Sequence, residues 1–266
     1  MSRTVHAIVA LAAAAFALPA VAQDSAELAK KLSNPVAALI SVPLQFNTDM
    51  NIGPDDAGER VTLNVQPVIP VSISEKWNLI SRIITPIVGV DEIFPGSGST
   101  VGLGDMTPTL FFSPKEPTKG GLIWGAGPVF LLPTATDDLL GADQWGFGPS
   151  FLVLKQQSGW TYGALVNHIE RVAGDDRLED ISTSFIQPFL SKTFPSSLTV
   201  GVNTESTYDW NQEQWTVPVN LTMTTITKWG KQVMQLGIGG RYYVEAPDNG
   251  PEWGIRMTVT LLFPKK

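Results

Sequence analysis

The chain has 266 residues, a formal net charge of −7 and a mean hydropathy of +0.09, and it contains no cysteine. Because there is no cysteine, no disulfide framework holds the fold, and burial and hydrogen bonding must do so. The net negative charge makes nucleic acid a poor partner, since binding to phosphate needs clustered lysine and arginine.

Residues 1–22 have the pattern of a secretory signal peptide. Arg3 lies near the start, residues 7–18 are apolar, and the segment ends in Ala20-Val21-Ala22, an A-x-A cleavage site. The alternative is a single membrane-spanning helix, but the apolar stretch is shorter than the roughly 18 to 20 residues that a span needs. After this segment, no apolar run is long enough to cross a bilayer as a helix. We expect an exported chain whose mature form begins after residue 22.

Residues 23–41 predict a short helical segment before the first strand. Asp24 or Ser25 is suited to cap a helix that ends at Leu32, and a second helix is expected to begin at Pro35, a residue that suits a first helical turn. Two interpretations stay open for this segment. It is either a periplasmic tail or a small plug that enters the fold formed by the rest of the chain.

From residue 42 onward one unit recurs, an alternating stretch followed by a break. In the last of these stretches, for example, Ile255, Met257 and Val259 alternate with Arg256 and Thr258, which is the period of a pleated strand. Each stretch is long enough for a tilted membrane strand, which needs about 9 to 11 residues. There are twelve, with the approximate ranges 42–50, 60–73, 77–90, 101–113, 121–134, 145–156, 160–172, 181–194, 198–210, 215–228, 232–246 and 252–263.

The breaks distinguish a membrane barrel from a soluble β-sandwich, which also alternates. Every second break is short, such as "SEK", "QSG" and "PSS", whereas the others are mostly longer and acidic, such as "GPDDAGE" and "TDDLLGADQ". Outer-membrane barrels have this asymmetry of tight periplasmic turns and longer outer loops. Residues 42–266 are therefore predicted to form an all-β transmembrane antiparallel up-and-down β-barrel of about 12 strands.

Charge and tryptophan support the same prediction. Every lysine after residue 22 lies before the first strand, at a short break or at the C-terminus, while the acidic residues gather at the longer breaks. A sandwich gives no reason for this separation. Seven tryptophans lie at or near strand ends, as in the aromatic girdles of membrane barrels: Trp77, Trp145, Trp160, Trp210, Trp215, Trp229 and Trp253.

Prolines interrupt many of the predicted strands without destroying their alternation. In "LNVQPVIPVSIS", residues 63–74, Pro67 and Pro70 stand inside a clean period of two, although proline cannot donate to a strand ladder. We expect kinks or bulges at such positions. These would bend the wall, either to shape a narrow lumen or to open a gap towards the bilayer.

The sequence offers few residues for catalysis or metal binding. After residue 22, His168 is the only histidine, so a transition-metal site is not expected, and no cofactor is expected either. A barrel lipase needs a serine beside the histidine, but the same-face neighbours of His168 along the chain are Val166 and Glu170. We therefore predict an interfacial, structural role for His168 near the outer rim, and a protein that is not an enzyme.

The inward faces of the strands supply the candidate functional residues. Asp105 and Glu205 against Arg241 and Arg256 form either a field that guides solutes across a constriction or ion pairs that stiffen the wall, and both readings stay open. The candidate lumen-lining residues are Gln45, Asn64, Gln66, Asp105, Asn203, Glu205, Asn220, Arg241, Tyr243 and Arg256, with Asn47, Asp49, Thr107 and Thr258 on the same faces.

The segments "LNVQPVIPVSISEKWNLISRIITPI", "GLGDMTPTLFFSP" and "GAGPVFLLPTATDDLLGADQWGFGPSFLVL" resemble the MetA-pathway of phenol degradation family. This resemblance is strongest over residues 34–154. It implies an outer-membrane, transporter-like barrel associated with the uptake of aromatic or other hydrophobic compounds, and it brings no catalytic motif. The chain departs from the usual outer-membrane ending because Phe263 is followed by "PKK".

The predicted function is passive uptake of small, hydrophobic or aromatic molecules across the outer membrane of a Gram-negative bacterium. Twelve strands leave a lumen wider than that of an eight-stranded barrel and narrower than that of a general porin. The expected partners are outer-membrane lipids and lipopolysaccharide, a small-molecule solute, and the barrel-assembly machinery during insertion. The alternatives are a non-transporting structural or adhesion barrel and, less favoured, an outer-membrane enzyme that modifies lipid.

Overall fold

The computed structural model describes residues 22–174 and 177–263. The signal peptide predicted for residues 1–22 lies outside this range except for Ala22, and so does the "PKK" ending. The described elements are one helix, α2 (Ala22–Leu32), and the strands β1 (Ile40–Ile52), β2 (Gly58–Val65), β3 (Val68–Ser72), β4 (Trp77–Asp91), β5 (Ser99–Leu103), β6 (Thr107–Pro114), β7 (Leu122–Leu131), β8 (Gln144–Gln157), β9 (Trp160–Gly174), β10 (Ser182–Thr193), β11 (Thr199–Thr204), β12 (Ser206–Asp209), β13 (Gln214–Trp229), β14 (Gln232–Glu245) and β15 (Trp253–Phe263).

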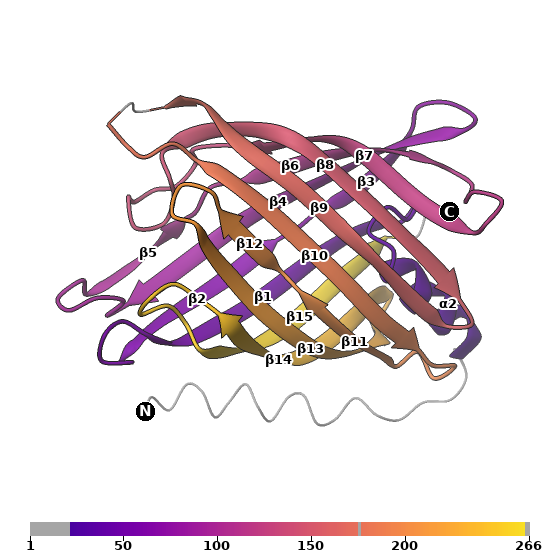
Figure 1. Cartoon of the computed structure of the whole chain (residues 1–266). Coiled ribbons are helices and arrows are strands. Elements are labelled where there is room, and N and C mark those ends of the chain that lie inside the picture. The colour runs from indigo at the N-terminus through magenta and orange to yellow at the C-terminus, as the bar shows by residue number, and fades with distance from the viewer. Residues whose placement is uncertain (1–21, 175–176, 264–266) are drawn as a thin grey trace.

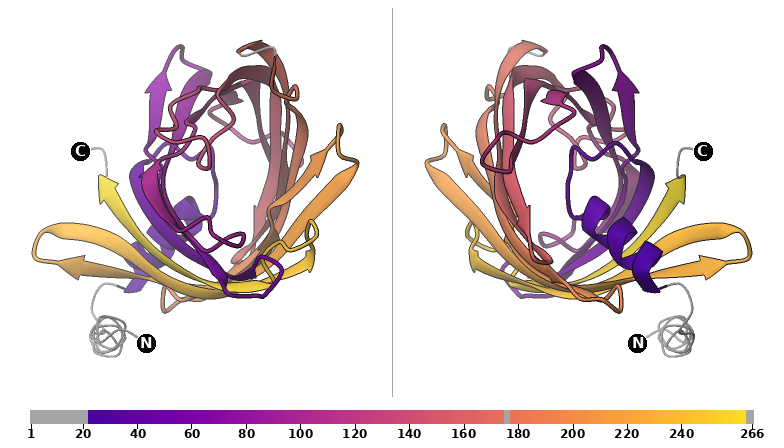
Figure 2. Two further views of the ribbon diagram at one scale, coloured as in Figure 1. Left: turned by 90° about the vertical axis from the view of Figure 1, so that its left-hand side faces the viewer. Right: turned by 90° about the vertical axis from the view of Figure 1, so that its right-hand side faces the viewer.

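The strands form a closed antiparallel barrel (Figures 1 and 2). The first strand β1 pairs with the last, β15, and β9 pairs with β10, so the ring has no free edge. Three short segments continue longer strands: β3 follows β2, β5 precedes β6, and β12 follows β11. The wall therefore has twelve strands, and the barrel predicted from the sequence is confirmed.

The outside of the barrel is an apolar belt. In β8 the exposed side chains Trp145, Phe147 and Phe151 alternate with buried ones such as Ser150 and Leu152, because successive residues of a strand point to opposite faces. An apolar outer face around a closed ring is the surface that lipid requires.

The seven predicted girdle tryptophans are all exposed and fall into two groups. At the end with the short turns, Trp77 begins β4, Trp160 begins β9 and Trp229 ends β13. At the end with the long loops lie Trp145, Trp210, Trp215 and Trp253. Tryptophan favours the boundary between hydrocarbon and headgroups, so these groups mark the two interfaces of the membrane.

The alternation around Pro67 survives because the break there does not change the register. Val65 pairs with Thr85 before the break and Val68 with Arg82 after it, which is the same alignment. The carbonyl of Pro67 still accepts a hydrogen bond from the Ile83 N–H, at 3.2 Å. The strand is thus interrupted without rotating its side chains to the other face.

Other prolines also coincide with irregularities of the wall, as expected. The β8–β9 ladder skips Gly148 and Pro149, and a bulge shifts the β13–β14 register between Val217 and Pro218. The register passes unchanged through Pro86 on the β2–β4 ladder and through Pro188 on the β9–β10 ladder. Only some of the strand prolines therefore bend the wall.

The N-terminal segment lies at the end of the barrel with the short turns (Figure 2, right). Helix α2 contacts β10 and β13, and no helix of the described chain is both long and apolar enough to cross a membrane. The second helix predicted from Pro35 does not form. The side chain of Asn34 instead accepts the Val36 N–H at 3.0 Å, which stabilises a turn in place of a helical start.

Candidate functional site in the barrel lumen

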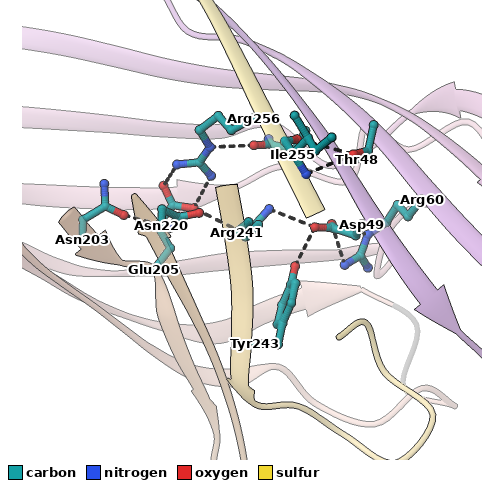
Figure 3. A network of polar contacts seen from close by, with 11 residues as sticks. Thr48, Asp49, Arg60, Asn203, Glu205, Asn220, Arg241, Tyr243, Ile255 and Arg256 are labelled. Atoms are coloured by element: carbon teal, nitrogen blue, oxygen red, sulfur yellow. Dashed lines mark hydrogen bonds and ion pairs between the residues drawn. The ribbon is translucent and has the colours of Figure 1, made fainter. Parts of the chain in front are cut away.

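One half of the inner wall carries a network of polar and charged side chains (Figure 3). The strands that supply it are neighbours around the ring, from β11 and β12 through β13, β14 and β15 to β1 and β2. Period-two alternation brings their polar residues inward together, because each strand presents every second side chain to the lumen.

Glu205, at the break between β11 and β12, is bound by two arginines. Its carboxylate accepts hydrogen bonds from Arg256 Nη1 at 2.9 Å, Arg256 Nη2 at 2.7 Å and Arg241 Nη2 at 3.3 Å. The paired bonds from Arg256 have the bidentate geometry that makes such pairs strong. Arg256 also donates from Nε to Asn47 Oδ1 at 2.7 Å, which fixes its plane.

Asp49 on β1 is a second centre of the network. Its Oδ1 accepts hydrogen bonds from Tyr243 Oη at 2.8 Å and Arg241 Nη1 at 3.2 Å, and its Oδ2 accepts from Arg60 at 3.2 and 3.3 Å. Arg241 therefore bridges Asp49 and Glu205. A buried carboxylate is stable only when its lone pairs are satisfied in this way.

A fourth arginine lies deeper in the lumen. Arg82 Nη2 donates to Gln66 Oε1 at 2.8 Å, and the Arg82 guanidinium is close enough to Glu205 for their charges to interact. The inward face of β4 therefore includes Arg82.

The other half of the inner wall is apolar. The buried cluster of Ile80, Phe111, Leu152, Leu154 and Leu165 comes from β4, β6, β8 and β9, and Phe185 and Phe189 of β10 pack against it. The sequence analysis expects apolar residues to face lipid and polar residues to face the lumen, and on this half that expectation is wrong.

The N-terminal segment fills part of this apolar half. Val36 is only 5% exposed and belongs to the same cluster as Phe111 and Leu152. The backbone carbonyl of Lys30 accepts a hydrogen bond from Gln156 Nε2 at 2.8 Å, which ties helix α2 to the end of β8. Val36 therefore packs inside the apolar half of the barrel, and the end of helix α2 is bound to the wall.

Two cavities lie along the lumen, separated by the charged network. The outer cavity, of about 600 Å³, is lined by Asp49, Arg60, Glu205 and Arg241 and by aliphatic side chains. The inner cavity, of about 240 Å³, lies beneath the N-terminal segment and is lined by Arg82, among others. Gln45 lines both cavities. Since Glu205 faces the outer cavity and interacts with Arg82 in the inner one, the network lies between the two cavities.

The predicted lumen residues divide into those within the network and those beside it. Glu205, Arg241, Tyr243 and Arg256 belong to it, and Gln66 joins it through Arg82. Gln45 and Asn64 line the outer cavity, and the side chains of Asn203 and Asn220 pair with each other at 2.9 Å.

Asp105 has a different role from the one predicted. Its carboxylate accepts the N–H groups of Thr134 and Ala135 at 3.1 Å and of Ala142 at 2.7 Å, so it anchors the loop between β7 and β8. This loop carries Leu139 and Leu140 to the outer cavity. The structure does not bring Asp105 to Arg241 or Arg256, so the predicted pairing there is wrong for this residue.

Arg60 and Arg82 are functional candidates that the sequence analysis missed. Arg60 begins a predicted strand beside acidic loop residues, and Arg82 interrupts an apolar run between Ile80 and Ile84. An arginine inside an otherwise apolar membrane strand is itself a signal, because such a charge is costly unless it faces a polar interior.

His168 lies on the outer face of the barrel near the long loops, in a chain of hydrogen bonds. The serine that is missing along its own strand stands directly opposite on β10: Ser184 Oγ is 2.9 Å from His168 Nδ1. His168 Nε2 is 2.7 Å from Glu170 Oε1, and the Trp210 indole donates to Ser184 Oγ at 2.9 Å. The wall beside this array has an apolar groove of about 940 Å³, lined by Pro149, Phe151 and Ile186 among others.

Solved structures with this fold are outer-membrane barrels. The COG4313 outer membrane channel from Pseudomonas putida F1 is 14% identical, with a TM-score of 0.68 over 85% of this chain and 96% of that chain. Outer membrane phospholipase A from Escherichia coli is 9% identical, with a TM-score of 0.50 over 88% of this chain and 97% of that chain. The KdgM porin in complex with disordered oligogalacturonate is 9% identical, with a TM-score of 0.48 over 84% and 99%.

No protein-family model matches the sequence, and no curated protein matches it. At identities this low the similarity establishes the fold, which is that of the outer-membrane β-barrels of Gram-negative bacteria. The barrel class implied by the resemblance to the MetA-pathway family is confirmed, while the family name itself stays a prediction.

Proposed function

We propose that the protein is a channel for passive passage of small hydrophobic or aromatic molecules across the outer membrane. The observation that carries the proposal is the two-sided lumen. An apolar cluster from β4 to β10 packs across one half of the lumen, and the cavity outside the charged network is lined by Val88, Val90, Leu139 and Leu140 as well as by charged groups. A general porin offers a wet, polar interior. Aliphatic side chains along this cavity instead lower the free energy of an apolar solute that enters it.

The surroundings that we propose for the barrel follow from its outer surface. The apolar belt between the two groups of tryptophans suits outer-membrane lipids, and the long loops suit contact with lipopolysaccharide. Insertion by the barrel-assembly machinery is part of the same proposal.

Replacing Val88 by asparagine should slow the entry of an apolar solute, because it puts an amide among the aliphatic side chains that line the outer cavity. The measurement is the uptake of N-phenyl-1-naphthylamine by porin-deficient Gram-negative cells that express equal amounts of folded protein. The matched control is Val88→Ile, which keeps the side chain branched and apolar. Equal uptake by cells with Val88→Asn and cells with the unchanged protein would contradict the proposal.

A second candidate function is hydrolysis of an acyl ester on the outer wall, favoured by the array of Ser184, His168 and Glu170. The indole N–H of Trp210 occupies one lone pair of Ser184 Oγ, which leaves the hydroxyl proton free to bond His168 Nδ1. The proton on Nε2 then bonds Glu170. In such a step Ser184 Oγ would attack the ester carbonyl while His168 takes the hydroxyl proton and passes it to the leaving alcohol. Water would release the acid by the reverse route.

We favour the channel over the hydrolase because a hydrolase needs hydrogen-bond donors that stabilise the negative charge of its transition state. In the described part of the chain, the N–H that reaches Ser184 Oγ is the indole of Trp210, whereas an oxyanion hole needs donors aimed at the oxygen of the substrate.

The hydrolase candidate predicts that Ser184→Ala lowers the turnover of a fluorogenic phospholipid in mixed micelles by about 10³-fold or more. Ser72→Ala is the control, since Ser72 lies at the other end of the barrel beside Lys115. Turnover no higher than that of micelles without protein would remove the hydrolase candidate and leave the channel proposal unaffected.

A further inference from the structure

The charged network of the lumen has more positive than negative groups. Within the described chain, the guanidinium groups of Arg60, Arg82, Arg241 and Arg256 surround the two carboxylates of Asp49 and Glu205. This leaves an excess of two positive charges. Charges inside a protein are stable when they are paired, so such an excess creates a site for an anion.

The two arginines of the outer cavity are not fully satisfied by the network. The Nε of Arg241 is buried and has no hydrogen-bond partner, which is uncommon for a buried donor. Arg60 bonds Asp49 through Nε and Nη2, and its side chain stays 40% exposed. Both guanidinium groups line the outer cavity.

The rest of the outer cavity is suited to an apolar group. Val88 and Val90 of β4 line it, together with Leu139 and Leu140 of the loop that Asp105 anchors. At about 600 Å³ the cavity falls within the usual range of small-molecule sites. The guanidinium groups of Arg60 and Arg241, the carboxylates of Asp49 and Glu205 that they pair, and aliphatic side chains thus line one cavity.

We propose that the outer cavity binds an amphipathic monoanion, a small carboxylate with an aromatic or aliphatic body. The carboxylate would lie against the guanidinium groups of Arg60 and Arg241, and the apolar body against Val88, Val90 and Leu140. This inference rests on the proposed channel function and narrows it from apolar solutes in general to those that carry one negative group.

The acidic outer loops do not remove this preference. Debye screening at physiological ionic strength acts over about 8 Å, so charges at the exposed rim are damped by salt. Charges within an enclosed site with low-dielectric walls are screened much less. The loops therefore affect the rate of approach more than the affinity of the cavity.

The test measures the binding of 3-phenylpropionate to the detergent-solubilised full barrel by calorimetry, with the heat of micelles alone subtracted. The neutral 3-phenylpropanamide and the cationic 3-phenylpropylamine are measured in parallel. We expect the carboxylate to bind about ten- to hundredfold more tightly than the amide, the effect of one hydrogen bond to a charged group. Arg60→Gln should lose this difference, whereas Lys231→Gln, which removes one positive charge from an exposed short turn, should keep it.

A second measurement keeps the test valid if Arg60→Gln folds poorly. The reversal potential of the unchanged barrel in a planar bilayer under a KCl gradient should show a preference for chloride, and Arg60→Lys should retain it. Equal binding of the three phenyl compounds, or inorganic phosphate competing as well as the carboxylate, would overturn the inference. If uptake of the neutral naphthylamine persists in that case, the channel proposal still stands, and if that uptake is also absent, both fail.

Discussion

Glu205→Gln is expected to destabilise the barrel by about 3–5 kcal/mol, the usual cost of removing one partner from a buried ion pair. Gln has nearly the same shape as Glu, so the loss comes from charge and not from packing. Arg241 and Arg256 would lose the carboxylate that binds them at 2.7 to 3.3 Å, and Arg82 would lose its nearby negative charge. The measurement is urea-induced unfolding in phospholipid vesicles, followed by tryptophan fluorescence.

The control for this prediction is Glu116→Gln, which removes the same charge from an exposed turn between β6 and β7. It should change stability by less than about 0.5 kcal/mol. In addition, Arg256→Gln combined with Glu205→Gln should be more stable than the sum of the single effects predicts, because the two residues interact directly. Additive effects would show that the Glu205 carboxylate does not hold the arginines in place.

Removing residues 25–38 is expected to raise the single-channel conductance several-fold. This segment puts Val36 into the apolar cluster and lines the inner cavity, so its removal widens the path below the charged network. The deletion ends before β1, which begins at Ile40, so every strand of the wall is kept. Conductance is measured in planar bilayers, and osmotic swelling of vesicles with a pentose gives a second readout.

A point substitution tests the same idea without shortening the chain. Val36→Asp places an unpaired charge among Phe111, Leu152 and Leu154, and the cost of burying it should drive the segment out of the mouth. Val36→Ile keeps the apolar contact and should leave the conductance low. Unchanged conductance in both the deletion and the Asp variant would mean that the segment does not limit the flow.

The architecture was predictable because the membrane imposes a strict pattern on it. Strands that face lipid must alternate in side-chain polarity, and the backbone groups of the connecting loops must hydrogen-bond to water at the two interfaces. The number of strands and the two kinds of break are therefore visible in the sequence. Glu205, Arg241 and Arg256 were predictable as inward residues for the same reason.

The apolar inner wall was not predictable from alternation. In β8 the inward residues Leu152 and Leu154 alternate with the outward residues Phe151 and Val153, so both faces are apolar and the period of two disappears. The sequence gives no sign of which apolar side chains meet across a lumen, because that depends on ring closure.

The pairing of side chains from different strands also required the register. Ser184 is opposite His168 only because β9 and β10 are aligned as they are, and a shift of one residue would turn Ser184 to the other face. The separation of Asp105 from Arg241 likewise depends on the loop that Asp105 binds. Local patterns show the face of a side chain but not its neighbour.

The division of the lumen into an apolar and a charged wall has a consequence for how a molecule travels. In the proposed channel, a compound with one apolar and one ionic edge can keep each edge against matching side chains of the outer cavity, so it does not need to tumble there. Turning over would place the apolar edge beside charged groups and the ionic edge beside aliphatic groups, and both placements cost free energy. Such a passage would sort compounds by the arrangement of their edges, and it would discriminate between positional isomers of equal size and equal oil–water partitioning.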